Sequence, residues 1–285
     1  FKHEKIKKLK EKKLAFLFSE NSIGFIFFYI YMLKKNYVIL LLNSDISIDD
    51  YNQLKTNYNP SAEVLPRLLL KKFNLNIKNI NKTKYNYSLF LNNISQNYYI
   101  HEELCLLLST SGSTGSKKFV KLSYENLNSN INAIVKSLNM KKSDSTVTTL
   151  PPEYSYGLSV INAHLNIGAT IYLNKFTIFD KKFLEIFDTY KITNLNGVPF
   201  FYDLLKKISF FKKINKKNLK FITQAGGAID EDTKNFTLKE LKDSNTNFYI
   251  MYGSTETAPR MSCFNLMKNQ NAKRGCIGLP IGDYK

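Results

Sequence analysis

The chain has 285 residues, enough for one large domain or two ordinary ones, and 44% of them are hydrophobic, which is ample for a buried core. Its formal net charge is +18, yet only Arg67, Arg260 and Arg274 are arginine among its 41 basic residues. Because nucleic-acid recognition usually uses the arginine fork, and the lysines are dispersed, we interpret the charge as solvated surface and predict no nucleic-acid partner.

The spacing of the cysteines and the length of the apolar runs indicate what class of protein this is. The three cysteines show no metal or redox spacing, which favours a reduced, cytoplasmic protein. The longest apolar run, Ile23 to Leu33, falls short of the ~20 residues of a spanning helix, so we predict a buried helix and no membrane span. The basic run from Lys5 to Lys13 is interpreted as a solvated helix face, with contact to an anionic surface as the alternative.

Strand-like and helix-like segments alternate along the chain. A strand over 13–18, a helix over 23–33 and a strand over 38–42 form a β-α-β opening, which implies a parallel sheet. The stretch 71–97 has little periodicity and is interpreted as a surface excursion or weak hairpin. Later strands are expected at 104–108, 119–122, 146–150, 170–173, 192–195, 219–223 and 248–252.

Helices are expected between these later strands. One begins after an N-cap at Ser123, with apolar residues at helical spacing from Leu127 to Leu138, and another follows an N-cap at Asp230. Others are expected at 158–165, 183–190 and 201–208. The predicted fold class is α/β, with large, mostly parallel sheets flanked by helices and no obvious interdomain linker. Two interlocked α/β subdomains remain possible.

A Ser/Thr/Gly loop follows one buried strand and precedes another. It reads Ser109-Thr110-Ser111-Gly112-Ser113-Thr114-Gly115-Ser116-Lys117-Lys118. Glycines let consecutive N–H groups point inward as an anion nest, hydroxyls add donors, and a lysine supplies charge for phosphate. A Walker A loop does not fit this sequence. A flexible linker is the alternative, but linkers rarely separate two strands, so the loop predicts a phosphate site.

Two further loops stand at the ends of predicted strands. Tyr252-Gly253-Ser254-Thr255-Glu256 offers a tyrosine ring for a base and a carboxylate for Mg²⁺. An ordinary turn with a surface glutamate explains this segment about equally well when it is taken alone. Gly226-Gly227-Ala228 permits close approach of the backbone to a flat ligand, although a tight turn into the next helix explains it nearly as well.

Together the three loops resemble the adenylate-forming superfamily of acyl- and aryl-CoA synthetases, peptide-synthetase adenylation domains and luciferases. The family's phosphate-loop pattern, TSGSTGxPKG, is matched from Thr110, with Lys118 at its lysine position and Lys117 and Phe119 replacing its Pro and final Gly. Its YGxTE pattern is met in full from Tyr252 to Glu256. Both motifs stand in the family's order.

The resemblance implies that a carboxylic acid reacts with Mg-ATP to give an acyl-adenylate, which passes to coenzyme A or a carrier-protein phosphopantetheine. Lys118, Thr255 and Glu256 would be the catalytic residues, with Glu256 holding Mg²⁺. The residues expected to contact the nucleotide are Thr110, Ser111, Gly112, Ser113, Thr114, Gly115, Lys118, Gly226, Gly227, Ala228, Tyr252, Gly253 and Thr255.

The segment from Leu150 to Leu158 resembles the one that opens the family's acyl pocket. The residues expected to contact the acid are Tyr154, Gly157, Val198 and Pro199. Amino-acid adenylation domains carry an Asp near Ser155, so its absence argues against α-amino acids. The aromatic and aliphatic lining favours an apolar acid, although these residues could equally be core.

The family's C-terminal lid domain and its catalytic lysine would lie beyond Lys285. We therefore expect a catalytically incomplete fragment that binds nucleotide poorly. The alternative is a non-catalytic nucleotide-binding or regulatory module with the same fold, and a basic nucleic-acid binder is a weaker third reading.

Overall fold

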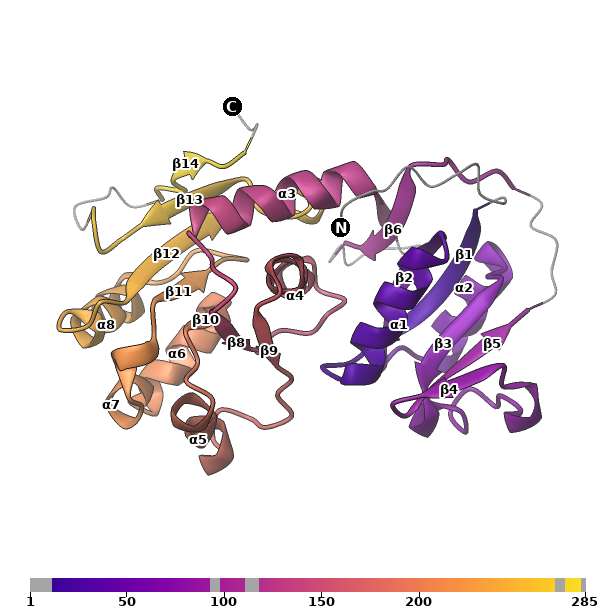
Figure 1. The fold of residues 1–285 in the computed structure, drawn as a ribbon, viewed down its shortest axis with the longest axis horizontal. Coiled ribbons are helices and arrows are strands. Elements are labelled where there is room, and N and C mark those ends of the chain that lie inside the picture. The colour runs from indigo at the N-terminus through magenta and orange to yellow at the C-terminus, as the bar shows by residue number, and fades with distance from the viewer. Residues whose placement is uncertain (1–11, 93–97, 111–117, 270–274, 283–285) are drawn as a thin grey trace. The chain divides into compact units, whose positions relative to one another are not determined.

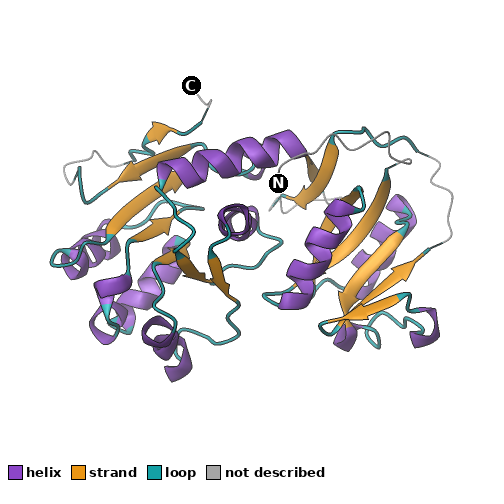
Figure 2. Ribbon diagram, in the orientation of Figure 1, coloured by secondary structure: helices purple, strands orange, loops and turns teal. Residues whose placement is uncertain are grey.

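The computed structural model describes residues 12–92, 98–110, 118–269 and 275–282. The chain divides into two compact units, residues 1–127 and 128–285. Each unit contains its own seven-stranded sheet with helices packed on it (Figures 1 and 2). The predicted α/β class is confirmed.

The first unit has the strand order β4-β5-β3-β1-β2-β6-β7. Its elements are β1 (Lys13–Ser19), α1 (Ile23–Lys34), β2 (Tyr37–Asn43), α2 (Ile48–Tyr58), β3 (Ala62–Pro66), β4 (Lys82–Lys84), β5 (Tyr87–Leu91), β6 (Leu104–Ser109) and β7 (Phe119–Ser123), with 3-10 turns at Arg67–Leu69 and Ile77–Asn79. Strand β1 pairs in parallel with β2 and β3, and β2 with β6. The outer strands β4, β5 and β7 are antiparallel to their neighbours.

In the first unit, one predicted alternative is confirmed and two elements were not predicted. The stretch predicted as an excursion or weak hairpin contains the hairpin β4–β5, and β5 buries Tyr87, Leu89 and Phe90 because it pairs with β3. Neither α2 nor β3 was predicted. Helix α2 buries only Tyr51 and Leu54, so its apolar pattern in the sequence is weak.

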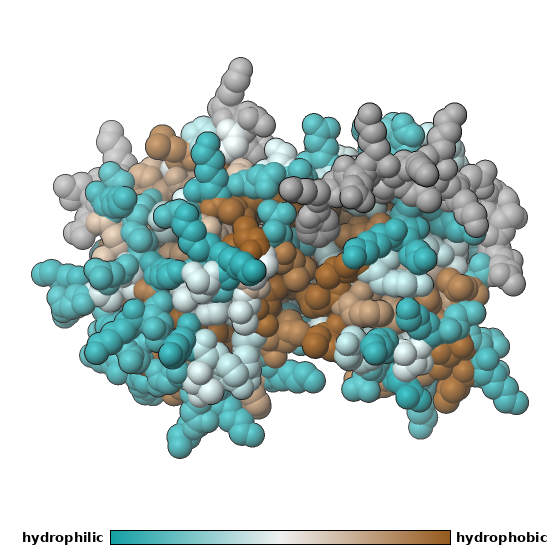
Figure 3. Space-filling view, in the orientation of Figure 1, coloured by the Kyte–Doolittle hydropathy of each residue, from teal (hydrophilic) through white to brown (hydrophobic). Residues whose placement is uncertain are grey.

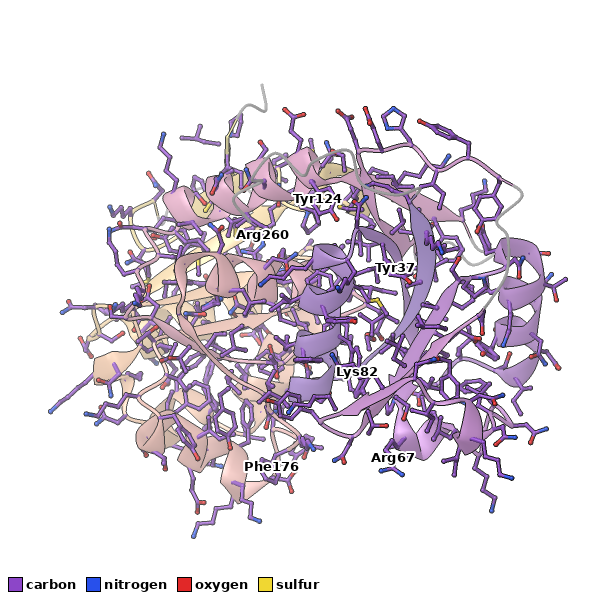
Figure 4. The ribbon with its side chains drawn as sticks, turned by 45° about the vertical axis from the view of Figure 1, so that its right-hand side comes forward. Tyr37, Arg67, Lys82, Tyr124, Phe176 and Arg260 are labelled. Atoms are coloured by element: carbon purple, nitrogen blue, oxygen red, sulfur yellow. The ribbon has the colours of Figure 1, made fainter. Side chains whose placement is uncertain are left out.

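Lys82 of β4 lies over the ring of Tyr31 on α1 (Figure 4).

The second unit has the strand order β14-β13-β12-β11-β10-β8-β9, and the division between the units falls within α3. Its elements are α3 (Tyr124–Ser137), β8 (Ser145–Val147), α4 (Ser155–Ile167), β9 (Thr170–Tyr172), α5 (Lys181–Thr189), β10 (Asn194–Gly197), α6 (Pro199–Lys207), α7 (Phe210–Lys213), β11 (Phe221–Gln224), α8 (Glu231–Leu241), β12 (Asn247–Tyr252), β13 (Ser262–Asn265) and β14 (Leu279–Pro280), with 3-10 turns at Lys216–Asn218 and Thr255–Thr257. Strands β8 to β12 are parallel, and β13 and β14 extend the sheet in antiparallel fashion.

Both predicted helix caps are confirmed. The amide of Asn126 donates to Ser123 Oγ at 3.1 Å, and that of Thr233 donates to Asp230 Oδ1 at 2.8 Å. Several strand boundaries differ from those predicted by one to three residues, among them the start of β11, which lies at Phe221 instead of residue 219. Strand β8 ends at Val147 instead of residue 150, and β10 begins at Asn194 instead of residue 192.

Two hydrophobic clusters cover the two faces of the second sheet. Helices α5 to α8 pack on one face, where Phe187, Tyr202 and Phe248 are buried, and α3 and α4 pack on the other (Figures 1 and 2). The surface over α5, α7 and α8 is largely hydrophilic (Figure 3), as expected for dispersed lysines. Within the described ranges, no helix is long and apolar enough to cross a bilayer.

Candidate functional site

The carboxyl ends of four parallel strands meet at one edge of the second sheet. Strands β8, β10, β11 and β12 are followed there by the segments 148–154, 198–199, 225–230 and 253–261. Open α/β sheets bind ligands at the carboxyl ends of their strands, where the loops take no part in strand pairing. All four segments carry residues that the sequence predicts to contact the nucleotide or the acid.

The predicted adenine-side residues lie on adjacent strand ends. Strands β11 and β12 are paired up to Gln224 and Ile250, so Gly226 and Tyr252 each lie two residues beyond the last pair of these neighbouring strands. The Tyr252 side chain is 48% exposed, and Gly226, Gly227 and Ala228 are exposed as well. An uncovered aromatic ring beside uncovered backbone is a surface on which a flat base can lie.

The predicted acid-side residues border the same glycines. A Cβ at Gly226 would stand 2.5 Å from Tyr154 Oη and 3.2 Å from Val198 Cγ1, and one at Gly227 would stand 3.4 Å from Pro199 Cγ. Any side chain at position 226 would displace Tyr154, and its φ of +86° also favours glycine. The adenine-side and acid-side predictions therefore form one continuous surface. Burial raises the pKa of Tyr154, so its hydroxyl stays protonated and able to donate.

Gly157 is enclosed within the first turn of α4. It is buried, and a Cβ there would stand 2.3 Å from the carbonyl oxygen of Pro151. Close packing of the helix on the preceding turn accounts for the glycine. Its contact with the acid stays a prediction.

The segment after β12 folds tightly back on itself. A Cβ at Gly253 would stand only 1.6 Å from the carbonyl oxygen of Pro259, so the turn admits glycine alone. The amide of Ser254 donates to Thr257 Oγ1 at 3.0 Å, which shapes the 3-10 turn carrying Thr255 and Glu256. The Thr255 hydroxyl lies 3.2 Å from that of Ser155 at the start of α4.

Glu256 is exposed, and its carboxylate is a hard oxygen donor of the kind that Mg²⁺ prefers. The described residues contain no cluster of three or more His, Cys, Asp or Glu side chains that could hold a metal by themselves. A single carboxylate nevertheless fits Mg²⁺ at a nucleotide, because this ion usually takes its remaining ligands from phosphates and water.

The predicted phosphate loop belongs to the first unit, where it connects β6 to β7. Residues 111–117, which include Ser111, Gly112, Ser113, Thr114 and Gly115, lie outside the described residues. At the base of the loop, the amide of Thr110 donates to the carbonyl of Lys118 at 3.3 Å, directly after the pair Ser109–Phe119. Lys118 is exposed and borders an open groove of about 1140 Å³ together with Tyr58, Tyr98 and Phe119.

Comparison with known proteins assigns the chain to a family. A family model described as AMP-binding enzyme matches residues 16–285. The chain belongs to the AMP-binding enzyme family. This confirms the resemblance predicted from the two long motifs.

Several of the matched relatives of this AMP-binding family member are ligases. It is 25% identical over 181 residues to the 2-succinylbenzoate–CoA ligase of Lactococcus lactis, which covers 63% of this chain and 38% of that protein. It is 30% identical over 165 residues to the D-alanine–D-alanyl carrier protein ligase of Lacticaseibacillus rhamnosus, which covers 56% of this chain and 30% of that protein. The chain thus spans well under half of either relative.

Solved structures agree on the fold of this AMP-binding family member. Escherichia coli MenE with bound OSB-AMS superposes with a TM-score of 0.68 at 16% identity, over 96% of this chain and 55% of that one. At this level of identity the likeness shows the fold alone.

In this AMP-binding family member, a buried network of side-chain hydrogen bonds lies beneath the strand ends and was not predicted from the sequence. Asn196 Nδ2 donates to Thr146 Oγ1 at 3.1 Å, and Thr223 Oγ1 donates to Asn196 Oδ1 at 2.6 Å. Tyr156 is placed by the sequence in the pocket-opening segment, but it is 3% exposed and donates its hydroxyl hydrogen to the Thr223 carbonyl at 2.9 Å. The network is internal, and its one signal in the sequence is the alternation of polar and apolar residues in Asn194-Leu195-Asn196.

Arg260 was also not predicted as a site residue. It is 2% exposed and lies beneath α3 in the view of Figure 4, four residues after the Tyr252 to Glu256 motif. The one signal in the sequence is an arginine where almost every other basic residue is lysine.

Proposed function

We propose that this protein activates a carboxylic acid with ATP and transfers the acyl group to a thiol. A carboxylate oxygen attacks the α-phosphorus of ATP, the bond from that phosphorus to the bridging oxygen breaks, and pyrophosphate leaves. A thiol of coenzyme A or of a carrier-protein phosphopantetheine then attacks the acyl carbon, and AMP departs. The carrier-protein alternative is kept because one matched relative is named as a carrier-protein ligase.

The observation that carries this proposal is the juxtaposition at the strand ends of a family member. Tyr252 and the backbone from Gly226 to Ala228 would frame the adenine, while Thr255 would donate to the α-phosphate. On the same edge, Tyr154 and Val198 border Gly226 and would receive the acid. An acid held there lies beside the phosphate that it attacks, and such positioning is the main contribution that a protein makes to this chemistry.

Charge neutralisation is assigned to two exposed side chains. Lys118 would bind the β- and γ-phosphates, together with hydroxyls and amides of the loop from Thr110 to Gly115. Glu256 would hold Mg²⁺, which when bound neutralises phosphate charge.

The acid is proposed to be apolar or aromatic. Tyr154, Val198 and Pro199 give the acid side an aromatic and aliphatic border. At the position where a carboxylate would pair with the ammonium of an α-amino acid, Ser155 stands within hydrogen-bond distance of Thr255. A neutral hydroxyl there offers no charge for an ammonium group.

Nucleotide binding tests this proposal without requiring turnover. ATP with Mg²⁺ should raise the melting temperature of residues 1–285 and bind measurably by calorimetry, even if weakly. Lys118→Ala and Glu256→Ala should each weaken binding about tenfold or more, since a hydrogen bond to a charged group contributes roughly 1.5–3 kcal/mol. Lys121→Ala on β7 and Glu125→Ala on α3 are controls of matched charge and exposure.

Absence of ATP binding by the unmodified chain, or equal losses in the control variants, would contradict the proposal. Measuring turnover tests whether the chain is an enzyme by itself. Pyrophosphate release with a panel of carboxylic acids would establish an enzyme and overturn the expectation of an incomplete fragment, whereas binding without any release agrees both with that expectation and with the non-catalytic alternative.

A further inference from the structure

Arg260 is a buried cation held by neutral groups. It is 2% exposed, and no carboxylate of the described residues forms an ion pair with it. Burial lowers the pKa of its guanidinium, which nevertheless stays charged because arginine titrates far above neutral pH. Burying a charge without an opposite charge is costly, so this position requires an explanation.

The guanidinium connects two elements of the second unit. Its Nε donates to Ser159 Oγ on α4 at 3.2 Å, and its Nη1 donates to Met251 Sδ on β12 at 2.9 Å. Its Cζ also lies 4.6 Å from the centre of the Tyr156 ring, a cation–π contact. Three neutral partners thus replace the missing carboxylate.

The backbone around Arg260 is fastened as well. Asn130 of α3, itself buried, donates from Nδ2 to the carbonyl of Arg260 at 2.7 Å and to that of Thr257 at 3.3 Å. The end of the 253–260 segment is therefore anchored to α3 through its backbone and to α4 through the Arg260 side chain.

Helix α4 meets the segment at two points, one turn apart. Ser155 and Ser159 are four residues apart and so lie on the same face of the helix. The first lies 3.2 Å from the Thr255 hydroxyl, and the second accepts from Arg260. Thr255, which the proposed function places at the α-phosphate, forms the first attachment, and Glu256, which it places at Mg²⁺, lies between the two attachments in the chain.

We propose that Arg260 is a positioning residue that fixes the 253–260 segment to the Ser155–Ser159 face of α4 and thereby holds Thr255 and Glu256 in place. This inference rests on the proposed function. Lysine cannot substitute fully, because one ammonium group cannot extend a planar fork to Ser159 and Met251 while stacking on Tyr156.

The test measures how much Mg²⁺ tightens ATP binding. The dissociation constant of ATP is determined by calorimetry with residues 1–285, once with Mg²⁺ and once with EDTA. In Arg260→Met we expect the Mg²⁺-dependent tightening to fall about tenfold, while affinity in EDTA changes less than threefold, because Tyr252 belongs to β12 and Thr255 keeps its own contact with Ser155. Arg260→Lys should recover part of the tightening.

Two controls separate positioning from general loss of stability. Phe187→Leu removes buried volume on the opposite face of the sheet and should lower the melting temperature without changing the Mg²⁺-dependent tightening. Arg67→Met replaces an exposed arginine of the first unit and should change neither.

Ser159→Ala provides the same test with a milder change, since it removes only the Nε acceptor. It should reduce the tightening about threefold even if Arg260→Met fails to fold. Undiminished tightening in Ser159→Ala and in any folded Arg260 variant would overturn the positioning role. If instead the unmodified chain binds ATP no better with Mg²⁺ than with EDTA, the proposed function of Glu256 fails first.

Discussion

The hydroxyl of Ser155 lies 3.2 Å from the hydroxyl of Thr255, which joins the first residue of α4 to the turn after β12. One residue before Ser155 stands Tyr154, whose hydroxyl abuts Gly226. The proposed acid side and the proposed phosphate side are thus connected through a single turn of helix. A small change on either side should be measurable on the other.

Replacing Thr255 should weaken ATP binding more than replacing its partner. Thr255→Val removes the donor proposed for the α-phosphate, so we expect about a tenfold loss of affinity, while Thr255→Ser should bind nearly as well as the unmodified chain. Ser155→Ala removes a positioning contact and should cost no more than about threefold. Calorimetric titration with ATP and Mg²⁺ measures all three, and a larger loss in Ser155→Ala would reverse the assigned roles.

Removing the Tyr252 ring should reduce binding of the adenine base. An aromatic contact contributes about 0.5–1.5 kcal/mol beyond area burial, so Tyr252→Ala should bind ATP roughly three- to tenfold more weakly. Tyr252→Phe keeps the ring and serves as the control. Inorganic triphosphate, which lacks a base, should bind all three proteins equally. An unchanged affinity of Tyr252→Ala for ATP would remove Tyr252 from the adenine site.

Gly253→Ala should destabilise the second unit. The new Cβ would stand 1.6 Å from the Pro259 carbonyl oxygen, so the turn must open, at a cost of roughly 1–3 kcal/mol. Gly227→Ala is the matched control because its Cβ would make an ordinary 3.4 Å contact with Pro199, and its stability should stay within about 0.5 kcal/mol. Urea unfolding compares the two variants. Equal stability of both would show that the turn relaxes freely.

His164 should make the protein less stable in mild acid. It is 1% exposed, and burial lowers its pKa to about 4, against roughly 6.5 in an unfolded chain. Above pH 6.5 both states are neutral at this site. As the pH falls from 6.5 towards 4, the unfolded chain takes up a proton that the folded protein does not, so stability is lost.

The loss from His164 between pH 7 and pH 5 should be about 2 kcal/mol. His164→Gln keeps a polar side chain beside Asn194 but does not titrate, so it should lack this part of the pH dependence. Urea midpoints of both proteins at the two pH values give the comparison. A loss of the same size in His164→Gln would assign the acid sensitivity to other groups.

Local patterns predicted much of the fold. The apolar runs of β1, β2 and β6 are buried on both sides, and such strands are recognisable without alternation. Ser123 and Asp230 marked their helices because a cap is a short-range contact. Helix α2 escaped prediction because it buries only Tyr51 and Leu54, and strands β13 and β14 because they are only four and two residues long.

Some residues of the candidate site could be recognised in the sequence and others could not. Loops at strand ends pointed to Gly226 and Gly253, and the structure leaves no room for a side chain at either position, while their contact with the nucleotide stays a prediction. Arg260 could not be recognised in this way. Its partners Asn130, Ser159 and Met251 come from three elements, and only the folded sheet brings them together.

The hydrogen bonds of Asn196 also protect the protein chemically. Asn196 is followed by Gly197, a dipeptide that deamidates readily in flexible chains because the next amide nitrogen can attack the side-chain carbonyl. Strand pairing with β11 and the bonds to Thr146, Asn194 and Thr223 hold the side chain away from that geometry. Each time the protein unfolds, these bonds are lost and the Asn196 side chain can deamidate. A molecule deamidated at Asn196 would carry a buried carboxylate in place of a donor to Thr146, and it should not refold.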